Sequence, residues 1–168
     1  MNAAHFHLVV NHLPIIFPIV GIIVLLTGLL IKSDPVKRTA YLIFIIGSLA
    51  SVAAMVSGEG AEDVVKNISG VTESFIERHE EKAKLFSILT YFQGGLSLIG
   101  LWVNFRQKSF SNIIAIAVLI FAFVVIYFGK LTGTSGGEIR HTEIRADNHY
   151  PSAAMNAQNN TEEEDEED

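Results

Sequence analysis

The sequence contains no cysteine among its 168 residues. This absence excludes disulfide bonds, thiolate-ligated iron–sulfur clusters, cysteine nucleophiles and the covalent attachment of c-type haem. It leaves open a haem or a metal ion held by histidine, since imidazole is a common ligand for both.

The chain also has no excess of basic over acidic residues. Its formal net charge is −6, but residues 162–168 are all acidic, and without them 12 basic residues face 11 acidic ones. A nucleic-acid binder needs a basic surface to neutralise phosphates, so that class is excluded. The polar stretch that precedes the acidic run predicts, together with it, a disordered acidic tail over residues 146–168.

Charged side chains are absent from four long apolar segments. A helix needs about 20 apolar residues to cross a bilayer, and each segment comes close to that length. We therefore expect an all-α fold, an integral membrane four-helix bundle within residues 1–145. No Lys or Arg precedes the first segment, so a cleaved signal peptide is not expected there. The spans are expected at about 13–31, 40–57, 85–103 and 113–129.

The basic residues between the segments predict an orientation. Residues 32–39 carry three basic side chains and one acidic one, and residues 104–112 carry two basic side chains and no acidic one. Short loops rich in Lys and Arg stay in the cytoplasm. The N-terminus, the loop 58–84 and the C-terminus are then periplasmic, in a multi-pass protein of the bacterial inner (plasma) membrane.

This topology brings all six histidines to the outer face. Imidazole binds haem iron, copper and zinc. A site made of histidine alone would favour haem b, whereas ligation shared with carboxylates such as Glu59 and Glu62 would favour a zinc, iron or manganese ion. The six are His5, His7, His12, His79, His141 and His149.

The third segment carries polar residues at helical spacing. Thr90, Gln93, Ser97 and Asn104 recur on one face, and the same face extends back to His79. We expect this face to point into the bundle, either for close helix packing or to leave room for a flat cofactor. In the loop before it, we expect a short amphipathic helix on the membrane and then a second helix, capped by Thr72, that runs into the third span.

Several short motifs resemble an uncharacterised bacterial family of four-helix membrane proteins. These are "HLVVNHLPII" at residues 7–16, Ser57-Gly58, His79 and "GGEIRH" at residues 136–141. Some members of that family are joined to Rieske domains, and it is loosely grouped with b-type cytochrome bundles. The resemblance covers about residues 5–145 and implies a redox or haem role.

The leading hypothesis is a haem-b electron-transfer protein that performs no bond-making chemistry. His12 and His79 are the expected axial ligands, with His7 and His141 as a second pair or as support. Its expected partners are the lipid bilayer, a redox protein or respiratory complex, and further copies of the chain. One alternative is a copper, iron or zinc site for transport or sensing, held by these four histidines with Glu59 and Glu62. Another is a structural membrane subunit without a cofactor.

Overall fold

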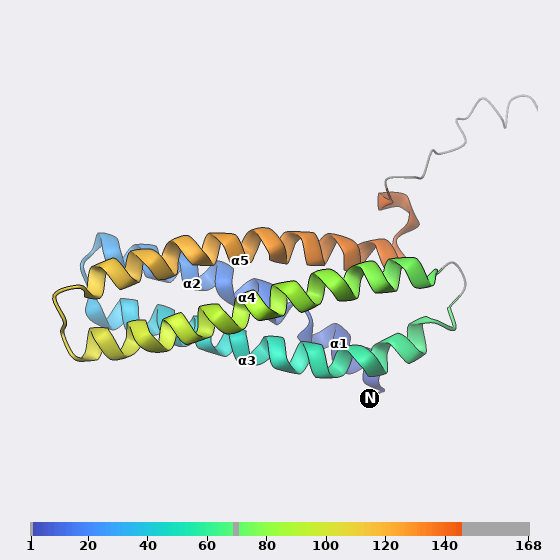
Figure 1. Cartoon of the computed structure of the whole chain (residues 1–168), viewed down its shortest axis with the longest axis horizontal. Coiled ribbons are helices and arrows are strands. Elements are labelled where there is room, and N and C mark those ends of the chain that lie inside the picture. The colour runs from blue at the N-terminus through green and yellow to red at the C-terminus, as the bar shows by residue number, and fades with distance from the viewer. Residues whose placement is uncertain (1, 69–70, 146–168) are drawn as a thin grey trace, which may run out of the picture.

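The computed structural model describes residues 2–68 and 71–145, which are helical with no strand between them. In these residues four long helices, α2 to α5, follow a short helix, α1. The long helices run side by side along the molecule (Figure 1). The predicted all-α four-helix bundle is therefore confirmed as an architecture. Its elements are α1 (Ala3–Val10), α2 (Leu13–Leu30), α3 (Asp34–Val65), α4 (Glu73–Phe105), α5 (Ser111–Arg140) and a final 3₁₀ turn (Thr142–Ile144).

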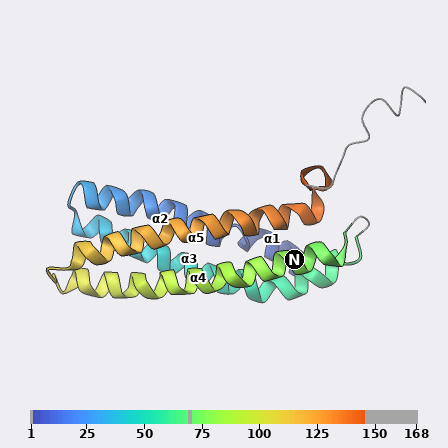
Figure 2. The ribbon, with the colours of Figure 1, turned by 45° about the horizontal axis from the view of Figure 1, so that its top comes forward.

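The bundle has two distinct ends. The short connections 31–33 and 106–110 lie together at one end, which we call the lysine end (Figure 1). The N-terminal helix α1, the α3–α4 connection and the end of α5 lie at the other, which we call the histidine end. The view in Figure 2 shows the same separation. All five described histidines belong to the histidine end, as predicted, while His149 lies outside the described residues.

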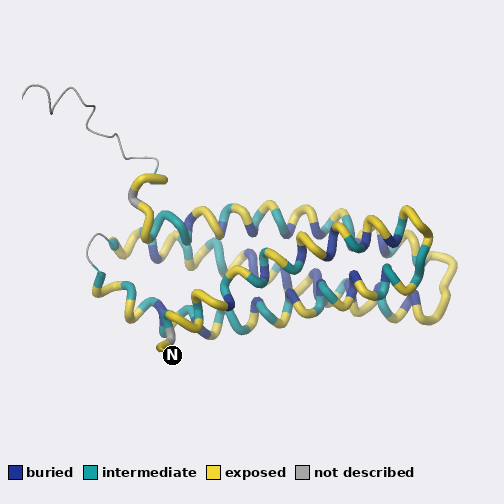
Figure 3. Tube along the Cα trace, turned by 180° about the vertical axis from the view of Figure 1, so that it is seen from behind, coloured by how far each residue is buried: buried dark blue, intermediate teal, exposed yellow. Residues whose placement is uncertain are grey.

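In the part of the chain that the structure describes, four helices are long and apolar enough to cross a membrane, the first combining α1 and α2. Buried positions recur on the sides of the helices that face one another, and exposed positions cover the outside (Figure 3). Much of that outside is apolar: Leu30 is 73% exposed, Val56 75% and Ile113 68%. Each apolar segment of the sequence therefore lies in a helix whose outer surface suits lipid better than water.

The loop between the second and third spans differs from the prediction. Residues 58–65 continue α3 without a break, so the separate amphipathic helix expected there is wrong. Packing explains the difference, because Ser57 and Ala61 are buried where α1 lies against α3. Tertiary contacts thus outweigh the low helix propensity of the intervening glycines. The second expected helix is confirmed, since α4 begins immediately after Thr72.

The polar face of α4 points into the bundle, as predicted. Thr90, Gln93, Ser97 and Asn104 are each at most 2% exposed. The Gln93 amide donates to the Val118 carbonyl oxygen of α5 at 3.3 Å. Interhelical hydrogen bonds of this kind hold helices together where no water competes for the polar groups.

Gly94 and Gly95 offer a test of this packing on neighbouring residues. A Cβ at Gly94 would lie 2.6 Å from the Ser48 Oγ and 2.7 Å from its Cβ, while a Cβ at Gly95 would meet nothing within 4 Å. We expect Gly94→Ala to lower the free energy of unfolding by about 1–3 kcal/mol, because α3 and α4 must move apart. Gly95→Ala should leave it unchanged or raise it by up to about 1 kcal/mol through helix propensity. Denaturant unfolding in detergent micelles measures both, and equal effects would contradict the close contact.

Candidate functional site

The short helix α1 positions the first histidine of the site. Asn2 begins the helix, and its side-chain oxygen accepts a hydrogen bond from the His5 backbone N–H at 2.9 Å. The helix is interrupted at residues 11–12. α2 then starts at Leu13 with Pro14 in its first turn, where the missing backbone N–H of proline costs no helical hydrogen bond. This arrangement places α1 against α3 and directs His7 toward it.

His7 is bound through one ring nitrogen to the backbone and side chain of α3. Its Nδ1 lies 3.1 Å from the Ala54 carbonyl oxygen and 2.9 Å from the Ser57 Oγ. The Ser57 hydroxyl also donates to the Ala54 carbonyl, at 3.0 Å. Because a carbonyl oxygen only accepts, this network assigns the hydrogen of the neutral imidazole to Nδ1. The Nε2 of His7 is then left with a free lone pair.

His79 is held in the same way by α5. Its Nδ1 lies 3.2 Å from the Ser135 Oγ, and the Ser135 hydroxyl donates to the Thr132 carbonyl oxygen at 2.9 Å. Since the hydroxyl hydrogen is used there, the Oγ accepts the hydrogen from Nδ1. The Nε2 of His79 therefore also carries a free lone pair.

Each imidazole lies over a glycine that follows the serine. A Cβ at Gly136 would lie 3.0 Å from the His79 Cε1, and a Cβ at Gly58 would lie 3.8 Å from the His7 Cε1. The missing side chain of Gly136 gives the His79 ring room to lie against the helix backbone, whereas the distance at Gly58 would also accommodate an alanine. Both histidines are partly buried.

The two histidine–serine–glycine units occupy equivalent places in two helical hairpins. His7 and Ser57 lie 25 residues before and after Lys32, and His79 and Ser135 lie 28 residues before and after Gln107. Lys32 and Gln107 follow α2 and α4 and are the two described non-glycine residues with positive φ, at 54° and 50°. Each hairpin therefore carries its own half of the site, and the bundle brings both halves to the histidine end.

Ser135 was missed by the sequence interpretation, and Ser57 entered it only through the family resemblance. The repeated Ser-Gly at 57–58 and 135–136 was the available signal.

The other predicted histidine ligands are exposed. His12 lies at the start of α2, and His141 follows α5. The His141 Nδ1 lies 2.8 Å from the Glu143 Oε1. The carboxylate of Glu143 accepts hydrogen bonds from its own backbone N–H and from the His141 ring, and both lower its pKa. Of the four histidines predicted to bind a cofactor, only His7 and His79 share a matched, partly buried setting.

The carboxylates of the metal-ion alternative lie along α3. Glu59 is exposed, and the Glu62 Oε1 forms an ion pair with the Lys66 Nζ at 2.8 Å. Within residues 2–68 and 71–145 there is no group of three or more histidine or carboxylate side chains that could hold a metal ion. The six predicted metal ligands are therefore not gathered into one cluster.

Comparisons with protein-family models, with curated proteins and with solved structures gave no match to this chain. The resemblance of residues 5–145 to a four-helix membrane family therefore stays a prediction. The strongest functional feature of the described chain is the pair formed by His7 and His79.

Proposed function

We propose that this chain is a membrane-embedded b-type haem protein that transfers electrons, in which His7 and His79 would hold the haem. The observation that carries the proposal is that both Nδ1 atoms are engaged while both Nε2 atoms keep a free lone pair. Histidines that bind a metal characteristically donate their other ring N–H to a carbonyl, hydroxyl or carboxylate, which fixes the tautomer and the ring orientation.

The number of available ligands favours haem over a free metal ion. A zinc site takes at least three protein ligands, and the described residues offer no group of three. Haem iron takes four nitrogens from the porphyrin, so two imidazoles complete its coordination. When bound, the haem would supply the one-electron redox chemistry. The chain would supply the two ligands and their orientation.

The surroundings of the pair suit a flat apolar group. Gly58 and Gly136 lie beside the imidazoles, and Gly133 and Gly129 follow along α5. A Cβ at Gly129 would lie 3.1 Å from the Phe86 Cε2, so an aromatic ring packs on that glycine. The nearest atoms of Ile15 would lie 3.6 Å from a Cβ at either Gly129 or Gly133. Small residues and aliphatic side chains thus line the bundle next to the two ring nitrogens, and they would exclude water from a porphyrin edge.

The proposal includes an orientation in the bilayer. The lysine end holds the two basic connections and would be cytoplasmic by the positive-inside rule. The histidine end and both termini would then face the periplasm of a bacterial inner membrane. His7 and His79 would hold the haem near that face, within reach of a redox partner. In this proposal His12 and His141 are surface residues rather than a second ligand pair.

Optical spectroscopy tests the proposal directly. The protein is expressed with ample haem supply and purified in detergent, and its reduced-minus-oxidised spectrum is recorded. We expect the bands of a low-spin haem with two nitrogen ligands, and one iron for each haem by metal analysis. Absence of haem absorbance, or copper or zinc bound in its place, would contradict the proposal.

A further inference from the structure

A buried lysine marks a second polar site, at the lysine end. Lys37 is only 4% exposed, although it carries a charge. Its Nζ donates to the Asp34 Oδ1 at 2.8 Å and to the Asn112 Oδ1 at 2.8 Å. An ammonium group has three hydrogens, so this arrangement leaves one of them available to a ligand.

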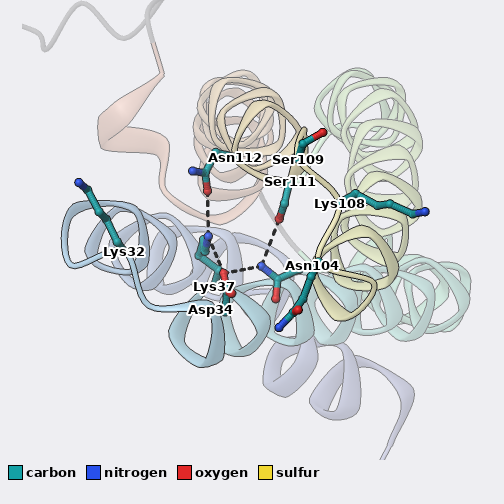
Figure 4. Close-up of a pocket in the computed structure, with 9 residues that line it drawn as sticks. Lys32, Asp34, Lys37, Asn104, Lys108, Ser109, Ser111 and Asn112 are labelled. Atoms are coloured by element: carbon teal, nitrogen blue, oxygen red, sulfur yellow. Dashed lines mark hydrogen bonds and ion pairs between the residues drawn. The ribbon is translucent and has the colours of Figure 1, made fainter.

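Asn104 fixes the base of the same site. The Arg38 Nε donates to its Oδ1 at 2.6 Å, and its Nδ2 donates to the Asp34 Oδ1 at 3.0 Å and to the Ser111 Oγ at 3.2 Å. Figure 4 shows Asp34, Lys37 and Asn104 linked at the centre of the pocket, with Ser111 bound to Asn104. The polar groups of α3, α4 and α5 are therefore held in place before any ligand arrives.

A cavity of about 300 Å³ opens over this network. Lys32 and Lys108 line it from the two connections and extend outward from its edges (Figure 4). In residues 2–68 and 71–145, neither lysine forms an ion pair. Three lysines, Lys32, Lys37 and Lys108, therefore line the cavity with the single carboxylate of Asp34, and the ammonium groups of Lys32 and Lys108 point away from it.

Two helix N-termini add to the positive potential. α3 begins at Asp34 and α5 begins at Ser111, both of which line the cavity. Neither N-cap residue, Ser33 or Phe110, makes a side-chain hydrogen bond to its helix. Helix N-termini carry a partial positive charge and backbone N–H groups that favour anions.

We propose that this pocket binds a phosphate group at the lysine end of the bundle. Lys32 and Lys108 close over the phosphate on their flexible stems, and the remaining Lys37 hydrogen reaches it from the buried side. The same chemistry is offered by the headgroup of an anionic phospholipid and by free inorganic phosphate. Basic pockets between helices on the cytoplasmic side of a membrane bind anionic headgroups in this manner. The site is independent of the proposed haem at the opposite end.

Thermal unfolding in micelles of a neutral detergent tests the site. The protein is titrated in separate arms with phosphatidylglycerol, with zwitterionic phosphatidylcholine and with inorganic phosphate, and the shift of Tm gives the apparent affinity. The test variant carries Lys32→Gln and Lys108→Gln, two exposed residues whose loss leaves the Lys37 network intact. The matched control carries Lys84→Gln and Lys130→Gln, which remove the same charge from exposed positions nearer the histidine end.

We expect phosphatidylglycerol to stabilise the wild type more than phosphatidylcholine does. The test variant should bind it about 30-fold more weakly, which corresponds to about 1 kcal/mol for each lysine, and the control should bind it like the wild type. Stabilisation by phosphatidylglycerol alone assigns the phosphate to a lipid, whereas an equal, lysine-dependent effect of inorganic phosphate assigns it to the free ion. No stabilisation by either ligand, or equal losses in test and control variants, would overturn the site.

Discussion

Replacing either His7 or His79 by alanine should remove the bound haem almost completely. In the proposed site each residue would supply one ligand to the haem iron. No other histidine of the described residues is held in an equivalent way, because His5, His12 and His141 are exposed. The expected result is a loss of nearly all haem absorbance per mole of purified protein, with the helical content unchanged by circular dichroism. A variant that kept its full haem content would contradict the assignment of that ligand.

Two further sets of variants separate ligation from general disturbance of the histidine end. His5→Ala and His141→Ala remove exposed imidazoles from the same end of the bundle and should leave haem content unchanged. Ser57→Ala and Ser135→Ala keep the ligands but remove a hydrogen-bond partner of each Nδ1. They should weaken haem binding by about 10- to 100-fold, as losses around a metal ligand usually do. If the serine variants behaved like the wild type, the Nδ1 contacts would have no part in holding the haem.

The structural features that depend on helical periodicity could be predicted from the sequence. Four uncharged apolar segments predicted four long helices, and the spacing of Thr90, Gln93, Ser97 and Asn104 predicted a buried polar face. These features depend on residues close together in the chain, or repeated at a helical interval. The structure confirms both because the helical repeat and the need to bury polar groups act along one helix at a time.

Which histidines form the candidate site depends on contacts between residues far apart in the sequence, and a local sequence pattern does not show such contacts. Pro14 indicated that a helix starts beside His12, so His12 was favoured as a ligand and His7 was placed outside the helix. The structure forms a separate helix, α1, before that break and packs it on α3, which turns His7 toward Ala54 and Ser57. The partners of His7 are 47 and 50 residues away, so only the hairpin geometry could show them.

The two equivalent half-sites hold their histidines independently of each other. Each hairpin fixes its own histidine through a serine and a carbonyl of the second helix, so neither ligand depends on the other for its orientation. The distance between the two ligands depends instead on how the hairpins pack together. A cofactor bound between them would therefore tie one hairpin to the other and stabilise the bundle.

At the lysine end the side chain of Asn104 connects the helices, and replacing it should be the most destabilising change there. It is 1% exposed and connects Arg38 and Asp34 of α3 with Ser111 of α5. Asn104→Ala leaves these groups without their buried partner, and each unsatisfied group costs about 1–3 kcal/mol. Because Arg38 and Asp34 keep partial access to solvent, we expect a total loss of about 2–4 kcal/mol in the free energy of unfolding.

The control for this change is Asn67→Ala, which removes an exposed asparagine in the turn after α3; among the described residues its side chain donates to the Asp63 carbonyl oxygen at the end of that helix. It should change stability by less than about 0.5 kcal/mol. Denaturant unfolding of both variants in detergent micelles measures the difference. Equal stabilities would mean that Asn104 does not join the helices. We expect Asn104→Ala to lose stability while it still binds the proposed haem. This result would show that the two ends of the bundle are stabilised independently. The reason is that each histidine of the pair is held within its own hairpin and not by the polar network at the lysine end.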